Sequence, residues 1–243
     1  MAYTLYEGPS MLDGGPIFAA VSGIDHVSTN RKTGHMAHIW YMRSDVPPIE
    51  AVHTGLDVSQ CGACILRGDG TGKGRSCYVT LLRGPNAVYK AYRGGFSKPL
   101  PHLAMLATEK IRLGAYGDPA SVPTNLTKLW AESSYAFTGY THQWRTCDPA
   151  LKRWLMASCD NEEDYYLAKS MGWRTFRIKA KGEIYFAEER NCPASPEGGH
   201  KTVCAYCLRC GGTDSSNSRD VAINVHGTGK KHFLKLLNGE GYE

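Results

Sequence analysis

The sequence predicts an α/β protein, a compact or incomplete TIM-like β/α barrel with a cysteine-rich, metal-binding insertion near the C-terminus. Three observations support this prediction. Short apolar segments typical of strands alternate with segments of helical periodicity. The chain has 243 residues, which is close to the usual length of one β/α barrel. Polar side chains follow the ends of successive strands, where barrel enzymes carry their chemistry. An open, doubly wound sheet is the alternative architecture.

The predicted elements alternate along the chain. Strands are expected at residues 16–23, 35–45, 111–117, 135–144, 154–160, 174–179 and 221–227, with a short strand or helix start at 77–82. Helices are expected at 47–55, 84–95, 102–110, 120–134, 161–173 and 230–238, with a glycine-rich loop at 65–76. Such alternation implies parallel strands joined by right-handed crossovers. We expect one catalytic domain over residues 1–243, with cysteine-rich segments at 61–77 and 192–210.

Composition and charge limit the partners. Hydrophobic residues make up 42% of the chain, and no apolar run approaches the length of a membrane span. We find no secretion signal, so we expect a cytoplasmic protein without a membrane partner. The net charge of +5 permits nucleic-acid binding without requiring it. Basic residues interleaved with aromatic ones favour a DNA-binding groove, although such charges are also common on a solvated surface. The candidate DNA-binding residues are Arg145, Lys179, Lys230 and Lys231.

Polar or ionisable side chains come at the ends of five consecutive predicted strands. The strand over 111–117 leads to Asp118, and the strand over 154–160 ends in Asp160. Two carboxylates facing one pocket allow one to attack or stabilise a sugar carbon while the other transfers a proton. We therefore take Asp118 and Asp160 as the candidate catalytic residues. The candidate substrate-binding residues at the same rim are Tyr116, Gly117, Tyr140, His142, Gln143 and Arg177.

Each of these residues also has a structural explanation. Asp118 precedes a proline, and Asp160 precedes an acidic helical segment, so either carboxylate could cap the following helix. His142 and Gln143 could be interior polar groups with satisfied hydrogen bonds, and the aromatic rings could belong to the core. The joint pattern at successive strand ends, rather than any single residue, favours an active site.

The nine cysteines are the strongest compositional signal. Their number is odd and most are clustered, which indicates metal ligands rather than disulfides. The run C-x2-C-x2-C at 204–210 can bring three thiolates to one ion. The candidate ligands of this site are Cys192, Cys204, Cys207, Cys210 and His226, and its metal is either zinc or part of an iron–sulfur cluster. A possible second metal site consists of Cys61, Cys64 and Cys77.

Several motifs together resemble a known enzyme family. They are NRKTGHM, CGAC followed by SCY, RLGAYGDPASVP, TGYTHQW, MASCD, GWRTFRI, and CPAS followed by CAYCLRC, and they span roughly residues 30–226. This set is similar to the phage-encoded DNA transglycosylases that install 7-deazaguanine bases, which are distant relatives of the tRNA-guanine transglycosylases of the queuosine pathway.

The resemblance implies a zinc-containing glycosyltransferase of the pentosyltransferase type, acting in the host cytoplasm. Its partners would be DNA and a free 7-deazaguanine such as 7-cyano-7-deazaguanine. A covalent sugar–aspartate intermediate would allow exchange of guanine for that base, which protects phage DNA from restriction. The sequence departs from the tRNA enzymes in two ways. Its cysteine run is C-x2-C-x2-C rather than C-x-C-x2-C, and no aspartate occurs between Asp164 and Asp214, where the nucleophile would be expected. Which aspartate attacks is therefore open.

Two alternative functions belong to other classes. The pair Cys77-Tyr78 after clustered cysteines, followed by the Gly117-Asp118-Pro119 turn, is similar in order to radical S-adenosylmethionine enzymes. In those barrel enzymes a Cys-Tyr pair ends the iron–sulfur motif, and a Gly-Glu-Pro-like turn binds the amino group of the cofactor. The spacing C-x2-C-x12-C would be a variant of their usual motif. The third possibility is a zinc-stabilised nucleic-acid binding protein without catalytic activity, against which the polar strand ends argue.

Overall fold

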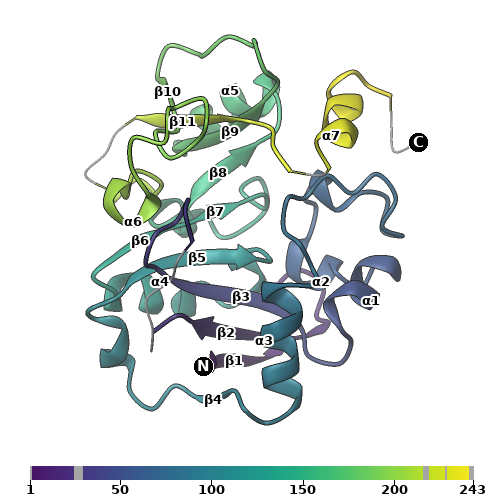
Figure 1. The fold of residues 1–243 in the computed structure, drawn as a ribbon, viewed down its shortest axis with the longest axis vertical. Helices are drawn as coiled ribbons and strands as arrows, with labels where there is room; N and C mark the ends of the chain where they lie inside the picture. Colours follow the sequence, from purple (N-terminus) through teal and green to yellow (C-terminus); the bar gives the residue numbers. More distant parts are fainter. Residues whose placement is uncertain (1, 25–29, 216–218, 228, 241–243) are drawn as a thin grey trace.

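The computed structural model describes residues 2–24, 30–215, 219–227 and 229–240. It is a mixed α/β protein with two sheets (Figure 1). The strands are β1 (Ala2–Pro9), β2 (Pro16–Ser22), β3 (Ala37–Arg43), β4 (Lys98–Pro99), β5 (Lys110–Tyr116), β6 (Ala136–Thr138), β7 (Tyr140–Thr141), β8 (Met156–Cys159), β9 (Thr175–Lys179), β10 (Glu189–Asn191) and β11 (Asp220–Asn224). The first sheet has the order β4-β1-β2-β3-β5-β6, and the second has the order β10-β11-β9-β8-β7.

The helices lie between these strands or on loops beside them. The α-helices are α1 (Pro48–His53), α2 (Val58–Cys61), α3 (Gly84–Arg93), α4 (Thr124–Ser133), α5 (Glu162–Ser170), α6 (Cys204–Cys207) and α7 (Lys230–Leu237). The 3-10 helices are η1 (Ile65–Arg67), η2 (Leu103–Leu106), η3 (Pro119–Ser121) and η4 (Pro149–Arg153). Within the described ranges, every helix falls short of the length and apolar character that a membrane span requires.

One residue, Gly139, separates β6 of the first sheet from β7 of the second. The two sheets therefore follow one another in space, and Figure 1 shows their strands stacked from β4 at the bottom to β10 at the top. From β3 onward, every neighbouring pair within a sheet is parallel. The carboxyl ends of these strands consequently lie along one side of the molecule, which is where the predicted site residues are expected to meet.

The predicted α/β class is confirmed, but the described strands form two sheets and no closed barrel. The expectation of all-parallel pairing is wrong for the N-terminal strands, because β2 pairs antiparallel with both β1 and β3. Only the six residues 10–15 connect β1 to β2, which is too short for a helical crossover and suits a hairpin. Residues 77–82 form neither a strand nor a helix, and the helix expected at 102–110 is reduced to η2.

The core lies on both faces of the first sheet. On β2, Ile17, Ala19 and Val21 pack into the main apolar cluster with residues of β3, β5 and α4. The alternate residues Phe18 and Ala20 face the opposite cluster, where α3 contributes further apolar side chains. Both faces of β2 are thus covered, which explains why its sequence is continuously apolar instead of alternating.

A buried ion pair joins β9 and β10 of the second sheet. The side chains of Arg177 and Glu189 are both 0% exposed, and Arg177 donates Nε–H to Oε1 at 2.7 Å and Nη2–H to Oε2 at 2.8 Å. We expect Glu189→Gln to lower the free energy of unfolding by about 3–5 kcal/mol, because it leaves a buried guanidinium undercompensated. Urea denaturation monitored by tryptophan fluorescence measures this change.

The matched control is Glu132→Gln, which breaks the exposed Lys128–Glu132 pair on α4. It should cost at most about 0.5 kcal/mol. Equal effects of the two variants would contradict the structural role assigned to Arg177.

Candidate functional site

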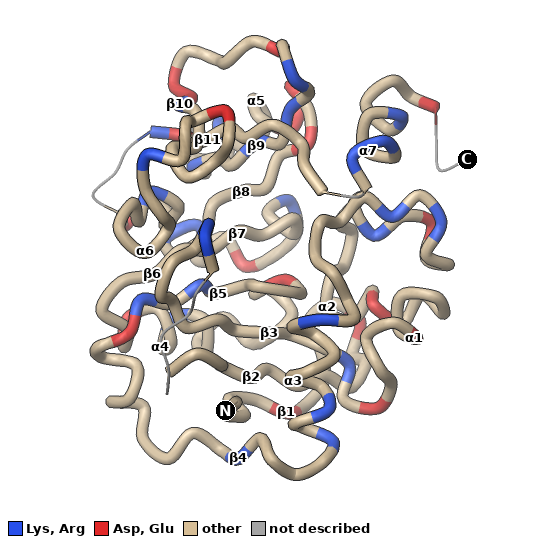
Figure 2. Tube along the Cα trace, in the orientation of Figure 1, with Lys and Arg blue, Asp and Glu red and all other residues tan. Residues whose placement is uncertain are grey.

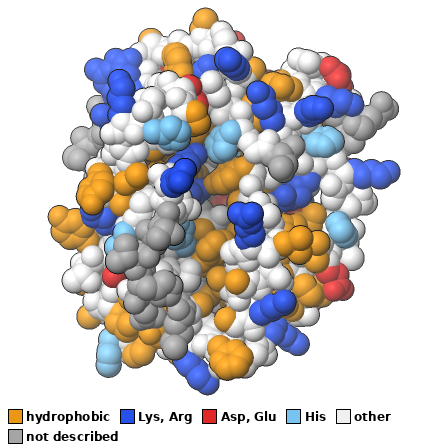
Figure 3. All heavy atoms as spheres, in the orientation of Figure 1, with side chains coloured by type: hydrophobic (Ala, Val, Ile, Leu, Met, Phe, Trp, Pro, Cys, Tyr) orange, Lys and Arg blue, Asp and Glu red, His pale blue; other side chains and the backbone are white. Residues whose placement is uncertain are grey.

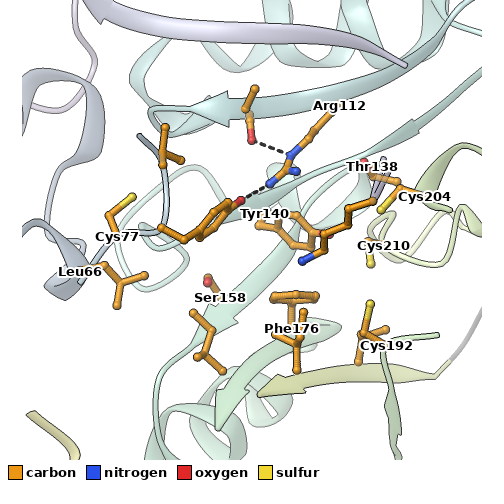
Figure 4. A pocket seen from close by; sticks show the side chains of 18 of the residues that line it. Leu66, Cys77, Arg112, Thr138, Tyr140, Ser158, Phe176, Cys192, Cys204 and Cys210 are labelled. Atoms are coloured by element: carbon orange, nitrogen blue, oxygen red, sulfur yellow. Dashed lines mark hydrogen bonds between the residues drawn. The ribbon is translucent and has the colours of Figure 1, made fainter. Parts of the chain in front are cut away.

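A cavity of about 170 Å³ opens at the carboxyl ends of the parallel strands. This is an order of magnitude more space than the ~10–15 Å³ that one water molecule needs, so the cavity can hold an organic ligand. Figure 4 shows Cys77 and Leu66 on one side of it, Cys192, Cys204 and Cys210 on the other, and Arg112 above Phe176. Figure 3 shows the same face of the molecule, with Lys, Arg and His side chains around an apolar hollow.

The loop that carries Cys61 and Cys64 is tied to the ends of two strands. The backbone N–H of Asp118, after β5, donates to the carbonyl of Gln60 at 2.6 Å. Gln143, after β7, donates Nε2–H to the carbonyl of Cys61 at 2.9 Å and accepts the Ala63 N–H at 3.1 Å. Both ends of the Gln143 amide are thus hydrogen-bonded to the cysteine loop. This structural role accounts for a polar residue at this strand end, so no contact between Gln143 and a substrate is needed to explain it.

Asp118 occupies the geometry of a helix cap. Its Oδ1 accepts the N–H of Ala120 at 2.9 Å, and its Oδ2 accepts the backbone N–H of His142 at 2.8 Å. Burial raises the pKa of Asp118, and these hydrogen bonds oppose that rise. The preceding turn requires Gly117, because its φ is +80° and a Cβ there would lie 2.5 Å from the carbonyl oxygen of Tyr41. Asp118 lines the cavity, but both of its oxygens already have backbone partners.

Asp160 has a different environment. The cap of α5 is Asn161, whose side chain accepts the N–H of Asp164, so Asp160 is not the capping residue. Its Oδ2 lies 3.5 Å from Nε2 of His142, whereas its Oδ1 is buried without a hydrogen-bond partner. Burial lowers the pKa of His142, but the neighbouring Cys64 and Asp160 outweigh this and raise it well above the ordinary value. Cys64, His142 and Asp160 therefore form one interacting group at the rim.

The thiols of the second set lie near one another, and metal binding by them stays a prediction. Cys192, Cys204 and Cys207 all interact electrostatically with Cys210. Burial raises the pKa of Cys210 to about 12, and the pKa values of Cys192 and Cys204 are also raised by burial. Figure 4 shows Cys192, Cys204 and Cys210 on the same side of the cavity. His226 lines the same cavity, but the contacts of its ring are with residues other than the thiols: Nδ1 lies 3.1 Å from the Asn224 carbonyl and Nε2 lies 3.4 Å from Nζ of Lys32.

The cysteines Cys61, Cys64 and Cys77 form the first thiol set, and all three line the cavity. Burial raises the pKa of Cys61 well above its usual value, and Cys64 and Cys77 raise it further. Soft, buried thiols of this kind suit zinc or an iron–sulfur cluster by their chemistry. In the described part of the chain, however, no three His, Cys, Asp or Glu side chains are arranged closely enough to hold a metal ion. Metal binding at either set rests on donor chemistry and proximity.

The remaining predicted residues have other contacts. Arg177 is held by Glu189, and Lys179 is 3% exposed and donates Nζ–H to the carbonyl of Glu183 at 2.6 Å. Arg145 pairs with Asp164 and lies over the ring of Trp144. Lys230 and Lys231 are exposed on α7, beside the basic loop that contains Arg67, Lys73 and Arg75 (Figure 2). Of the four candidate DNA-binding residues, only these two lysines have no side-chain partner among the residues that the structure describes.

Arg112 and Phe176 line the cavity although the sequence patterns did not point to them, and Tyr78 of the Cys77-Tyr78 pair lines it as well. The alternation within β5 is a signal that could have found Arg112, because Arg112, Gly114 and Tyr116 share one face of this strand and all line the cavity. Tyr140 and Tyr116 were selected and do line it, and the Tyr140 ring lies 4.4 Å from that of Phe176.

In comparisons with protein families, curated proteins and solved structures, no family model, sequence or fold matches this chain. What the cavity does must therefore follow from its own residues.

Removing the Gln143 amide should loosen the first thiol set. Gln143→Ala leaves the Ala63 N–H unpaired and removes one of the two hydrogen bonds to the Cys61 carbonyl, which keeps the bond from the Cys64 N–H, so we expect a loss of about 1–3 kcal/mol in the free energy of unfolding. We also expect faster alkylation of Cys61 and Cys64, measured by peptide mapping with mass spectrometry, while buried Cys159 in the same protein is unchanged. Thr146→Ala, at an exposed position of the same turn, is the control. Alkylation rates equal to those of this control would contradict the bracing role.

Proposed function

We propose that this protein is an enzyme of the radical S-adenosylmethionine type, with an iron–sulfur cluster on Cys61, Cys64 and Cys77. One observation carries the proposal. The three parts of the sequence pattern similar to that class, namely the thiols, Tyr78 and the Gly117–Asp118 turn, line one cavity. The hydrogen bond from Asp118 N–H to the Gln60 carbonyl joins the turn directly to the cysteine loop. In this proposal the strands from β3 to β11 form an incomplete barrel around the cofactors.

The residues of the chain have definite tasks in this proposal. Three thiolates would hold the cluster, which when bound would supply the electron for reductive cleavage of S-adenosylmethionine. Because burial raises the pKa of Cys61 and Cys77, cluster binding must release protons from these thiols. Asp118 fixes the turn that faces the cofactor, and Gln143 holds the cysteine loop against it. Aromatic and apolar side chains make up much of the wall between the two thiol sets.

The second thiol set would hold its own metal in this proposal. Cys192, Cys204, Cys207 and Cys210 supply four sulfurs, which is a closed ligand set typical of structural zinc. Their position across the cavity from Cys77 (Figure 4) makes this metal a wall of the substrate site.

Metal analysis of protein purified without oxygen and without added metal tests the proposal. We expect iron, sulfide and visible absorption from the first set, and one further metal from the second. Cys64→Ser should remove the iron and the colour but leave the second metal, and Cys207→Ser should do the reverse. Cys159→Ser, which alters a buried thiol outside both sets, is the control. Colourless wild-type protein without iron would exclude the cluster.

A second candidate function is base exchange in DNA by a transglycosylase. Asp160 favours it, because Oδ1 of this buried carboxylate has no hydrogen-bond partner and Oδ2 faces His142. Asp160 would attack the sugar carbon, His142 would transfer protons, and Asp118 would only position His142 through its backbone N–H. Zinc on the second thiol set would be structural, and Lys230 and Lys231 would contact DNA phosphates in the cytoplasm.

Exchange of radiolabelled guanine, or of 7-cyano-7-deazaguanine, into DNA tests this second candidate. Asp160→Asn should reduce exchange by at least about a thousandfold, because it removes the nucleophile. Asp118→Asn should mainly lower stability, since it weakens a cap. Asp148→Asn, which alters the exposed cap of η4, is the control and should retain full activity. Full exchange by Asp160→Asn would exclude this mechanism.

A further inference from the structure

The cavity contains positive charge that no carboxylate neutralises. Arg112 lines it from β5 and donates Nε–H to the Gly114 carbonyl at 3.2 Å and Nη2–H to the hydroxyl of Tyr78. Burial lowers the pKa of Arg112, and Tyr78, Tyr140 and Cys204 raise it by more. None of these neighbours is a carboxylate, so the guanidinium is held by neutral oxygens while its charge faces the cavity.

A second cation, Lys32, and a histidine, His226, line the same cavity as Arg112. Their Nζ and Nε2 atoms are 3.4 Å apart. The pKa of His226 is lowered by burial and then by the charge of Lys32, with a smaller contribution from Arg112. Glu197 acts in the opposite direction on His226. A neutral His226 can accept a hydrogen bond from Lys32 but does not neutralise its charge, so an anion in the cavity would pair with Lys32.

Acidic groups do not balance these charges inside the cavity. Among the described residues that line it, Asp118 is the only Asp or Glu, and both of its oxygens accept backbone N–H groups. The walls between the cations are aromatic. The rings of Tyr140 and Phe176 are 4.4 Å apart, the ring of Tyr78 lies 5.3 Å from that of His226, and Arg112 lies over Tyr140 at 5.9 Å. A flat ring can stack on such walls.

We propose that Arg112 and Lys32 form an oxyanion subsite for the phosphate of a nucleotide whose base stacks on the aromatic wall, with His226 at its rim. A phosphate monoester is favoured over a carboxylate because it carries nearly two negative charges near neutral pH, which matches more than one fixed cation. The inference identifies nucleotides as the substrate class of the proposed enzyme. It rests on the proposed function only in taking the cavity to be the substrate site.

Calorimetric titration of the purified, metal-containing protein with GMP, guanosine and inorganic phosphate tests the subsite. GMP should bind about ten- to a hundredfold more tightly than guanosine, as one or two charge-assisted hydrogen bonds provide. Arg112→Gln and Lys32→Gln should each reduce the affinity for GMP and leave that for guanosine unchanged. Arg112→Lys keeps the charge and should bind GMP more tightly than Arg112→Gln does. Such a partial recovery would show that the weaker binding of Arg112→Gln comes from the lost charge and not from misfolding. Lys90→Gln, on the exposed face of α3, is the control.

Equal affinities of wild-type protein for GMP and guanosine, or no binding of GMP at millimolar concentration, would overturn the subsite. Tighter binding of S-adenosylmethionine than of GMP that depends on Arg112 would overturn the assignment to phosphate in favour of a carboxylate. The proposed function fails separately. If protein without iron still binds GMP through Arg112, the phosphate subsite stands and the proposed cluster is wrong. If iron-containing protein does not bind GMP, the cluster stands and the subsite is wrong.

Discussion

The carboxylate of Asp118 is the contact on which the rest of the site depends. It accepts backbone N–H groups from Ala120 and His142, while its own N–H donates to Gln60. One buried residue thereby joins the end of β5, the turn after β7 and the loop before Cys61. Hydrogen bonds to a charged acceptor contribute about 1.5–3 kcal/mol each, which offsets much of the cost of burying the carboxylate. The sharp turn at Gly117 places Asp118 so that its carboxylate and its backbone N–H together reach all three segments.

The cavity combines this rigid rim with an unusual distribution of charge and sulfur. Thiols of both sets lie in it, on opposite sides, and Arg112 lies between them with neutral hydrogen-bond partners (Figure 4). Because burial raises the pKa of Cys61, Cys77, Cys192, Cys204 and Cys210, these five thiols are protonated near neutral pH when no metal is bound, and they are poor nucleophiles in that state. The positive charge of Arg112 and Lys32 is then not compensated from within the protein. Metal binding would convert the thiols to thiolates, and this would supply negative charge to the cavity. An anion bound at Arg112 would supply negative charge to the same space.

Local sequence patterns predicted most strands and helices, and the ends of the parallel strands correctly identified Asp118, Tyr140 and His142 as residues of one rim. The errors have physical causes. Antiparallel pairing of β1 and β2 follows from a short connection, and apolar periodicity does not encode strand direction. Arg177 comes at a strand end like the other candidates, but its partner Glu189 lies on β10, a strand that its sequence did not reveal. The role of Gln143 depends on a loop 80 residues earlier in the chain, a long-range contact that no local pattern contains.

The burial of Asp160 separates the two candidate functions. This side chain is nearly inaccessible, and His142 rather than Asp160 lines the cavity. A carboxylate that attacks a sugar must contact the substrate directly, so the transglycosylase requires His142 to move and open a path to Oδ1. The cluster enzyme requires no such movement. There Asp160 only keeps His142 charged and oriented beside Cys64, a role that its 3.5 Å distance from Nε2 already permits. The cluster enzyme instead requires the thiols of the first set to approach one another, because in the described part of the chain no three such side chains lie closely enough to hold a metal.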